Sequence, residues 1–152
     1  MTKLDALEEY AKSIDVHIYD FHFSETKRAS CVRCGSYSAV TIDRAAIETR
    51  SEERILLAEE LGHYETGSLY VLDAMHNTPN AKINSSKQEA KARHWAYEIC
   101  LPPSSIKRAM QFCDDEYALA EYCDVTVEFL CKALEYYLTK GIEFTYNDYS
   151  GA

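Results

Sequence analysis

The feature that most constrains the fold is the segment Glu-Arg-Ile-Leu-Leu-Ala-Glu-Glu-Leu-Gly-His-Tyr at residues 53–64. Its apolar side chains recur at helical spacing, which predicts a single helix. Glu59 and His63 are four residues apart and share one face of that helix, and Glu60 borders the same face. Two carboxylates and an imidazole that face one way are typical of a metal-dependent hydrolase site, but a solvated acidic helix also produces this pattern.

Composition and charge exclude several classes of protein. The chain of 152 residues is long enough to bury a hydrophobic core without disulfides. Its 16 Lys and Arg residues against 25 Asp and Glu residues give a net charge of −9, so we expect no direct binding of nucleic acid. The sequence shows no signal peptide and no run long enough to span a membrane. We therefore expect a cytoplasmic protein without a membrane partner, whose six cysteines are reduced thiols.

The N-terminal part is predicted to combine one helix with a small sheet. Apolar residues recur at helical spacing from about Lys3 to Ser13. Short strands are predicted at residues 16–19, 29–32 and 37–42, and the last two flank a hairpin turn at Gly35-Ser36. We expect the three strands to form a small antiparallel sheet.

Two Ser/Thr-x-x-Glu capping boxes predict where the longer helices begin. The box at residues 49–52 opens the central helix, and the box at residues 86–89 opens a helix that runs from residue 88 to residue 100. Residues 65–84 are predicted to be a loop with a short helical piece at 69–75. Gly62 weakens the last turn of the central helix, so its purpose would be the close approach of another backbone.

The C-terminal part is predicted to be helical. A short helix is expected over residues 105–112, and two more over residues 116–140 with Thr126 as the N-cap of the second. The fold class is therefore α+β. We expect a domain of residues 1–115 and a helical hairpin of residues 116–152 that packs on the same core.

The residues Glu59-Glu60-Leu61-Gly62-His63 differ at one position from the zincin motif His-Glu-x-x-His. In the full motif two histidines hold Zn²⁺ and the glutamate is the general base. Because Glu59 replaces the first histidine, the motif alone favours a solvated acidic helix. The apolar neighbours at residues 55–58 count against that interpretation, since an acid beside apolar surface needs a partner.

A second segment strengthens the metal-site interpretation. Residues 54–67 resemble the metal-site helix of the ImmA/IrrE family of metallopeptidases. Residues 87–96, followed by Leu101-Pro102, resemble the family's second signature, in which an acidic residue before an alanine supplies the third metal ligand. The likeness covers residues of about 35 to 139 and is closest to short members carried by phages and mobile elements. It implies a zincin-like fold for the helices that carry the site.

This resemblance assigns a role to each site residue. His63 and Glu89 match metal ligands, Glu60 matches the general base, and Glu59 occupies the place of the first histidine ligand. One Zn²⁺ ion is implied, or Mn²⁺ or Fe²⁺, because two carboxylates make a harder ligand set. The resemblance implies a peptidase that acts on a transcriptional repressor. The alternative is a non-catalytic relative that uses the same fold to bind a regulator protein.

Two further patterns have competing interpretations. Cys31 and Cys34 have the spacing of a zinc knuckle, with His17 and His22 upstream, but two thiols in a hairpin are the favoured interpretation. Residues 119–130 have the rhythm of a helix-turn-helix. The second helix of that pair is too acidic to approach phosphates, so a helical hairpin is favoured over a DNA-binding element.

Overall fold

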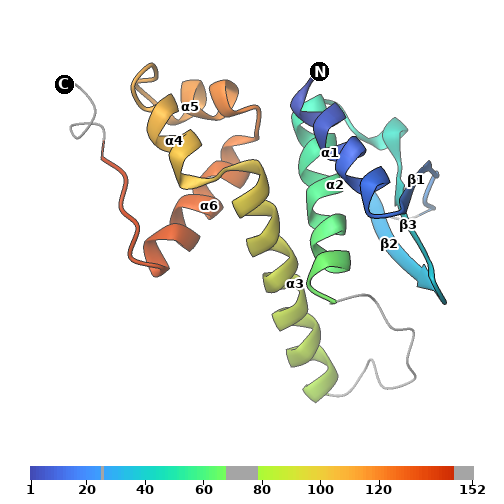
Figure 1. Ribbon diagram of the computed structural model, residues 1–152. Coiled ribbons are helices and arrows are strands. Elements are labelled where there is room, and N and C mark those ends of the chain that lie inside the picture. The colour runs from blue at the N-terminus through green and yellow to red at the C-terminus, as the bar shows by residue number, and fades with distance from the viewer. Residues whose placement is uncertain (25, 68–78, 146–152) are drawn as a thin grey trace. The chain divides into compact units, whose positions relative to one another are not determined.

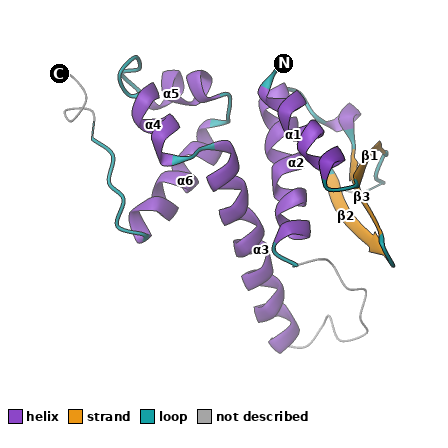
Figure 2. Ribbon diagram, in the orientation of Figure 1, coloured by secondary structure: helices purple, strands orange, loops and turns teal. Residues whose placement is uncertain are grey.

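The computed structural model describes residues 1–24, 26–67 and 79–145 of the chain, with the backbone alone for residues 79–85 (Figure 1). These residues form one three-stranded sheet and six α-helices, which confirms the α+β class (Figure 2). The chain divides into two compact units within one long helix, an N-terminal unit (Met1–Ala96) and a C-terminal unit (Tyr97–Ala152). The expected division at residues 115 and 116 stays a prediction.

The N-terminal unit opens with helix α1 (Lys3–Ser13), whose predicted bounds are confirmed. The strands β1 (Val16–Asp20), β2 (Ala29–Cys34) and β3 (Tyr37–Ile42) also lie where the sequence predicts them. A short 3-10 helix, η1 (Arg44–Ala46), then leads to α2 (Arg50–Glu65). Burial alternates at the start of β1 and of β2, whereas the central strand β3 buries Ser38, Ala39 and Val40 in succession. Figure 1 shows α1 and α2 packed against the sheet.

The sheet is mixed, so the prediction of a purely antiparallel sheet is wrong for β1. Strands β2 and β3 form the predicted antiparallel hairpin around Gly35, whose φ of 62° suits a glycine in a tight turn. The strand order is β1-β3-β2, and β1 runs parallel to β3. Because β3 lies between β1 and β2, the connection at residues 21–28 must span two strand spacings. This distance is only about 10 Å, which eight residues cover easily. The hairpin therefore folds back and places β3 beside β1.

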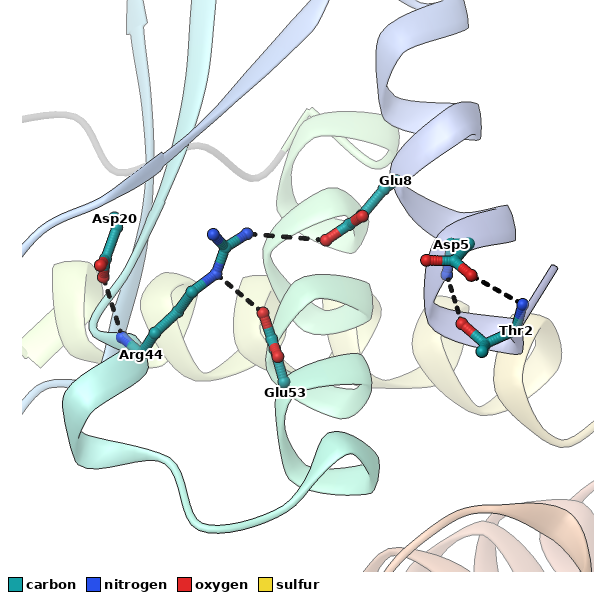
Figure 3. A network of polar contacts seen from close by, with 6 residues as sticks. All are labelled: Thr2, Asp5, Glu8, Asp20, Arg44 and Glu53. Carbon is teal, nitrogen blue, oxygen red and sulfur yellow. Dashed lines mark hydrogen bonds and ion pairs between the residues drawn. The ribbon is translucent and has the colours of Figure 1, made fainter.

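Arg44 joins three elements of the N-terminal unit (Figure 3). Its Nε donates to Glu53 Oε1 of α2 at 2.9 Å, and its Nη2 lies 3.6 Å from Glu8 Oε1 of α1. The backbone N–H of Arg44 donates to Asp20 Oδ1 at the end of β1, at 3.1 Å. Because the Arg44 side chain is half-exposed, these pairs orient the elements more than they stabilise them.

Only half of the predicted capping box of α2 is present. The hydroxyl of Thr49 accepts a hydrogen bond from the backbone N–H of Glu52 at 3.1 Å, as predicted. The carboxylate of Glu52 accepts from the N–H of Glu48, at 3.3 Å, instead of from Thr49. Glu52 also forms an ion pair with Arg28, which draws its carboxylate away from the N-cap.

The long helix α3 (Pro79–Cys100) begins earlier than the sequence analysis predicts. Ser86 lies inside α3, so the second capping box is wrong as a helix start, and residues 79–84 are helical where a loop was predicted. Proline is tolerated in the first turn of a helix because its missing N–H has no helical partner there. The residues between Pro79 and Ser86 include neither glycine nor proline to end a helix. The predicted helical piece at residues 69–75 lies outside the described residues.

The C-terminal unit contains α4 (Pro103–Ala109), α5 (Glu116–Cys123) and α6 (Val127–Thr139). The predicted break between α5 and α6 is confirmed, and Thr126 caps α6 by accepting from the N–H of Phe129 at 3.2 Å. Tyr137 lies in the core of this unit, where its hydroxyl donates to the carbonyl oxygen of Leu101 at 2.7 Å. The ring of Phe129 packs edge-on against Tyr97, with ring centroids 5.1 Å apart.

The six cysteines are free thiols, and four of them are buried. Within the described residues no helix combines the length and apolar character that crossing a membrane requires.

At Gly62 the backbone of α2 lies directly against the backbone of α3. A Cβ atom built on Gly62 would lie 2.4 Å from the carbonyl oxygen of Ala92. That oxygen belongs to the backbone, so it cannot swing aside as a side chain would. The predicted role of Gly62, the close approach of another backbone, is confirmed.

We expect Gly62→Ala to lower the free energy of unfolding by about 1–3 kcal/mol, because the added methyl group overpacks a backbone contact. The melting temperature, measured by circular dichroism, should fall by about 3–10 °C for a chain of this length. An ordinary helical glycine would respond in the opposite direction, since alanine has the higher helix propensity. Lys91→Ala, at an exposed position beside Ala92, serves as the control and should change little. An increase in the melting temperature of Gly62→Ala would contradict the packing interpretation.

Candidate metal-binding and catalytic site

The predicted site residues on α2 lie at the border between the core and solvent. Leu57, Ala58 and Leu61 are fully buried and hold the helix against the sheet. Glu59, Glu60 and His63 are partly buried. This placement follows from the helical period, because residues one position before or after a buried stripe lie at its edge.

The structure brings together two of the three predicted ligands. His63 Nε2 of α2 lies 3.3 Å from Glu89 Oε2 of α3. The His63 side chain is 14% exposed and that of Glu89 is 51% exposed, so the pair lies between the packed interior and solvent. The Gly62–Ala92 contact explains this proximity: His63 follows Gly62 directly, and Glu89 precedes Ala92 by one helical turn.

Glu60 has an environment that disfavours its charge. Burial, and secondarily the neighbouring carboxylates of Glu59 and Glu89, raise the pKa of Glu60 to about 7, while the positive charge on His63 opposes this rise. A carboxyl group with a pKa near 7 can both accept and release a proton at neutral pH. That property suits the general base predicted at this position.

Two residues near Glu60 were not predicted to belong to the site. Cys31, on the buried face of β2, lies close enough for Glu60 to help raise the pKa of its thiol to about 12, although burial is the larger cause. Lys27 also acts on Glu60, and its positive charge lowers the carboxyl pKa. For Cys31, the alternation at the start of β2 was a signal available in the sequence. It turns the Cys31 side chain toward the face of the sheet on which α2 packs.

The separation of His63 and Glu89 suits a metal ion. Two ligands of a tetrahedral zinc ion, each about 2.0–2.2 Å from the metal, lie about 3.3–3.6 Å apart. The observed 3.3 Å between Nε2 and Oε2 falls at the lower end of that range. Glu59 is not gathered with them, because the described parts of the chain contain no cluster of three or more candidate ligands. The imidazole and one carboxylate therefore fit a metal ion, and the third donor is not in place.

The zinc-knuckle interpretation of Cys31 and Cys34, which the sequence analysis disfavours, finds no support, because no cluster of three or more candidate ligands exists among the described residues. Cys31 is buried and Cys34 exposed, because they are three residues apart on a strand and point to opposite faces of the sheet. His17 stacks on the ring of Tyr37, and His22 pairs with the buried carboxylate of Asp43 at 2.9 Å.

The fold and the site define a class: an α+β protein in which two packed helices present a histidine, a carboxylate and a second carboxylate of raised pKa. A family model for the peptidase M78 family, described as the IrrE N-terminal-like domain, matches residues 41–135. The chain belongs to this family of metallopeptidase-like proteins. The matched region includes α2 and α3 in full and therefore all four predicted site residues. No curated protein and no solved structure matches the chain.

The raised pKa of Glu60 predicts a pH-dependent stability. An unfolded glutamate has a pKa of about 4.3. The folded state holds this proton up to about pH 7, so Glu60 lowers the free energy of unfolding as pH rises from about 4 to about 7. Glu60→Gln removes the charge, and we expect its melting temperature in metal-free protein to exceed that of the wild type at pH 8.

The difference should disappear near pH 4, where Glu60 is protonated in both states. Glu143→Gln is the control, because Glu143 is exposed and lies outside α2, and it should give no such pH-dependent gain. An equal gain for both variants at pH 8 would refute the assignment of the effect to Glu60.

Proposed function

We propose that this protein is a metal-dependent peptidase of the ImmA/IrrE type, encoded by a phage or mobile element, that acts on a transcriptional repressor in the cytoplasm. The observation that carries the proposal is the proximity of His63 Nε2 and Glu89 Oε2 at 3.3 Å, beside a carboxyl group of raised pKa. Membership of the peptidase M78 family supports the reaction class.

The residues divide into ligands and a base. His63 and Glu89 would hold one divalent ion, with Glu59 as the third donor after a change of its side-chain conformation. The ion, when bound, polarises the peptide carbonyl and activates the attacking water. Glu60 accepts the proton of that water and passes it to the amine of the leaving peptide. Because its pKa is raised to about 7, Glu60 can both accept and release a proton at neutral pH.

Glu59 sets this chain apart from a site with two histidines. Two carboxylate ligands would offset more of the metal's charge than two histidines do, so the bound ion would activate water less strongly and the reaction would be slower. Carboxylates also favour harder ions, so Mn²⁺ or Fe²⁺ competes better with Zn²⁺ than at a two-histidine site. We therefore propose weaker metal binding, or a different metal, and slow or conditional cleavage.

A second candidate function is regulator binding without catalysis. The observation in its favour is that Glu59 replaces a histidine and is not gathered with His63 and Glu89 within the described residues. Such a relative would keep the fold and the surface that recognises the repressor, but it would not hydrolyse a peptide bond.

Metal binding can be tested by thermal stability. We expect Zn²⁺ or Mn²⁺ at 100 times its dissociation constant to stabilise the folded chain by about 2.7 kcal/mol, which raises the melting temperature by about 5–10 °C. The substitution His63→Ala should abolish this increase. The substitution His17→Ala should retain it, because His17 lies on the face of the sheet away from α2. The metal-site proposal fails if protein purified without chelator contains less than a tenth of an equivalent of any transition metal and neither ion raises the melting temperature.

Cleavage of the cognate repressor separates the two candidate functions. Glu60→Gln keeps the size of the side chain and removes the base, so we expect it to lower the rate constant by about 100-fold or more while the repressor still binds. The control Glu143→Gln, at an exposed position outside the matched region, should cleave at the wild-type rate. Gel electrophoresis measures cleavage and anisotropy measures binding. A wild type that binds the repressor and never cleaves it, with metal supplied, would establish the binding function instead.

A further inference from the structure

The solvent face of α5 carries large aromatic side chains. Tyr117 is 69% exposed and Tyr122 is 48% exposed. Phe112, in the loop before α5, is 68% exposed, and its ring stacks on Tyr122 with centroids 5.7 Å apart and an interplanar angle of 13°. We call Phe112, Tyr117 and Tyr122 the aromatic face. Exposed rings gathered in this way mark interaction sites more often than ordinary surface.

The opposite side of α5 explains why these rings cannot turn inward. Leu119, Ala120 and Cys123 are buried and occupy the side of the helix that faces the core of the C-terminal unit. Tyr117 and Tyr122 lie about 140° apart around the helix axis, on either side of the outward direction. The aromatic face is therefore fixed outward by the packing of α5 itself.

The sequence around the aromatic face is strongly acidic. Residues 109–131 contain six acidic side chains and neither lysine nor arginine, and this stretch is flanked by Lys107 and Arg108 on one side and Lys132 on the other. Several of the six already have partners within this unit. Glu128 forms an ion pair with Lys132 at 2.8 Å, Asp115 accepts from the N–H of Ala118 at 2.8 Å, and the Cys131 thiol contacts Glu116. The six acidic residues are Asp114, Asp115, Glu116, Glu121, Asp124 and Glu128. Glu121 lies between the two tyrosines on the outer side of α5, so negative charge adjoins the rings directly.

We propose that the aromatic face and its acidic surroundings form a docking surface for a basic protein segment that contains arginine. A guanidinium group is attracted to the face of an aromatic ring and pairs with carboxylates, so it satisfies both halves of this surface. Nucleic acid and anionic membranes carry the same sign of charge as the surface and are repelled. A second copy of the chain that docked by a two-fold contact would bring the same acidic face and would be repelled.

This inference goes beyond the peptidase reaction, because docking needs neither the metal nor Glu60. The DNA-binding surface of a repressor has the required chemistry, since it is basic in order to neutralise phosphates. That identification of the partner rests on the proposed function, whereas the docking surface does not. Binding to metal-free protein therefore tests the surface separately from the reaction.

The probe is a short fluorescent peptide of arginine, glycine and serine, with lysine and glutamate versions as comparisons. The fluorescence anisotropy of the peptide is measured while the full chain, treated with chelator, is added. The titration gives the affinity of the chain for the peptide. We expect the arginine peptide to bind, the lysine peptide to bind more weakly because it stacks less well on rings, and the glutamate peptide not to bind. Failure of the wild type to bind the arginine peptide would overturn the proposal.

Two double variants test the two halves of the surface. F112A with Y122A should weaken binding of the arginine peptide roughly tenfold through lost ring contacts. D114N with E121Q should weaken it roughly fivefold through lost charge pairing. All four positions are exposed, and circular dichroism verifies that the helices remain.

Matched variants elsewhere distinguish a docking surface from net charge. E9Q with E143Q removes the same number of charges at exposed positions outside the surface, and Y19A with F21A removes two exposed rings from the N-terminal unit. Each should change the affinity less than twofold. Equal losses in the control and surface variants would show that only overall charge or aromatic content matters, and would overturn the proposal.

Discussion

The candidate site depends on one contact between two backbones. Gly62 of α2 has no side chain, so α3 approaches until the carbonyl oxygen of Ala92 would collide with any Cβ atom. Each helix carries a predicted metal ligand within one turn of this contact, His63 on α2 and Glu89 on α3. The distance between the His63 imidazole and the Glu89 carboxylate is thus set by the backbone packing beneath them, and such rigid support is what a preorganised site requires.

The position of α2 at the edge of the core explains the raised pKa of Glu60. The buried leucines hold the helix against the sheet, and the carboxyl group is left with too little water to favour its charge. Glu59 and Glu89 add to this effect, and His63 partly offsets it. The same apolar surroundings raise the pKa of the neighbouring Cys31 thiol, so this cysteine is a small hydrophobic residue and not a nucleophile. One environment therefore produces a proton acceptor and an inert thiol side by side.

Local patterns in the sequence predicted the elements better than their arrangement. Two short strand-forming stretches on either side of the Gly35 turn were sufficient to predict the hairpin, because these signals depend only on neighbouring residues. The parallel pairing of β1 depends on residues more than 20 positions apart, so no local pattern indicated it. Ser86 resembles an N-cap, yet the helix continues through it from Pro79. Among the site residues, the pairing of His63 with Glu89 followed from the family resemblance, whereas the proximity of Cys31 and Lys27 to Glu60 required the packing of the sheet.

The mixed sheet has a consequence for the order in which the chain assembles. The central strand β3 is the last of the three to be synthesised, and β1 has no other strand to pair with in the described sheet. The local hairpin of β2 and β3 can close in microseconds. Strand β1 can pair only after β3 is in place, and its pairing closes a longer loop, which costs more conformational entropy. We therefore expect the N-terminal segment to dock onto a hairpin that has already formed, so that the sheet face against which α2 packs is completed only at that step.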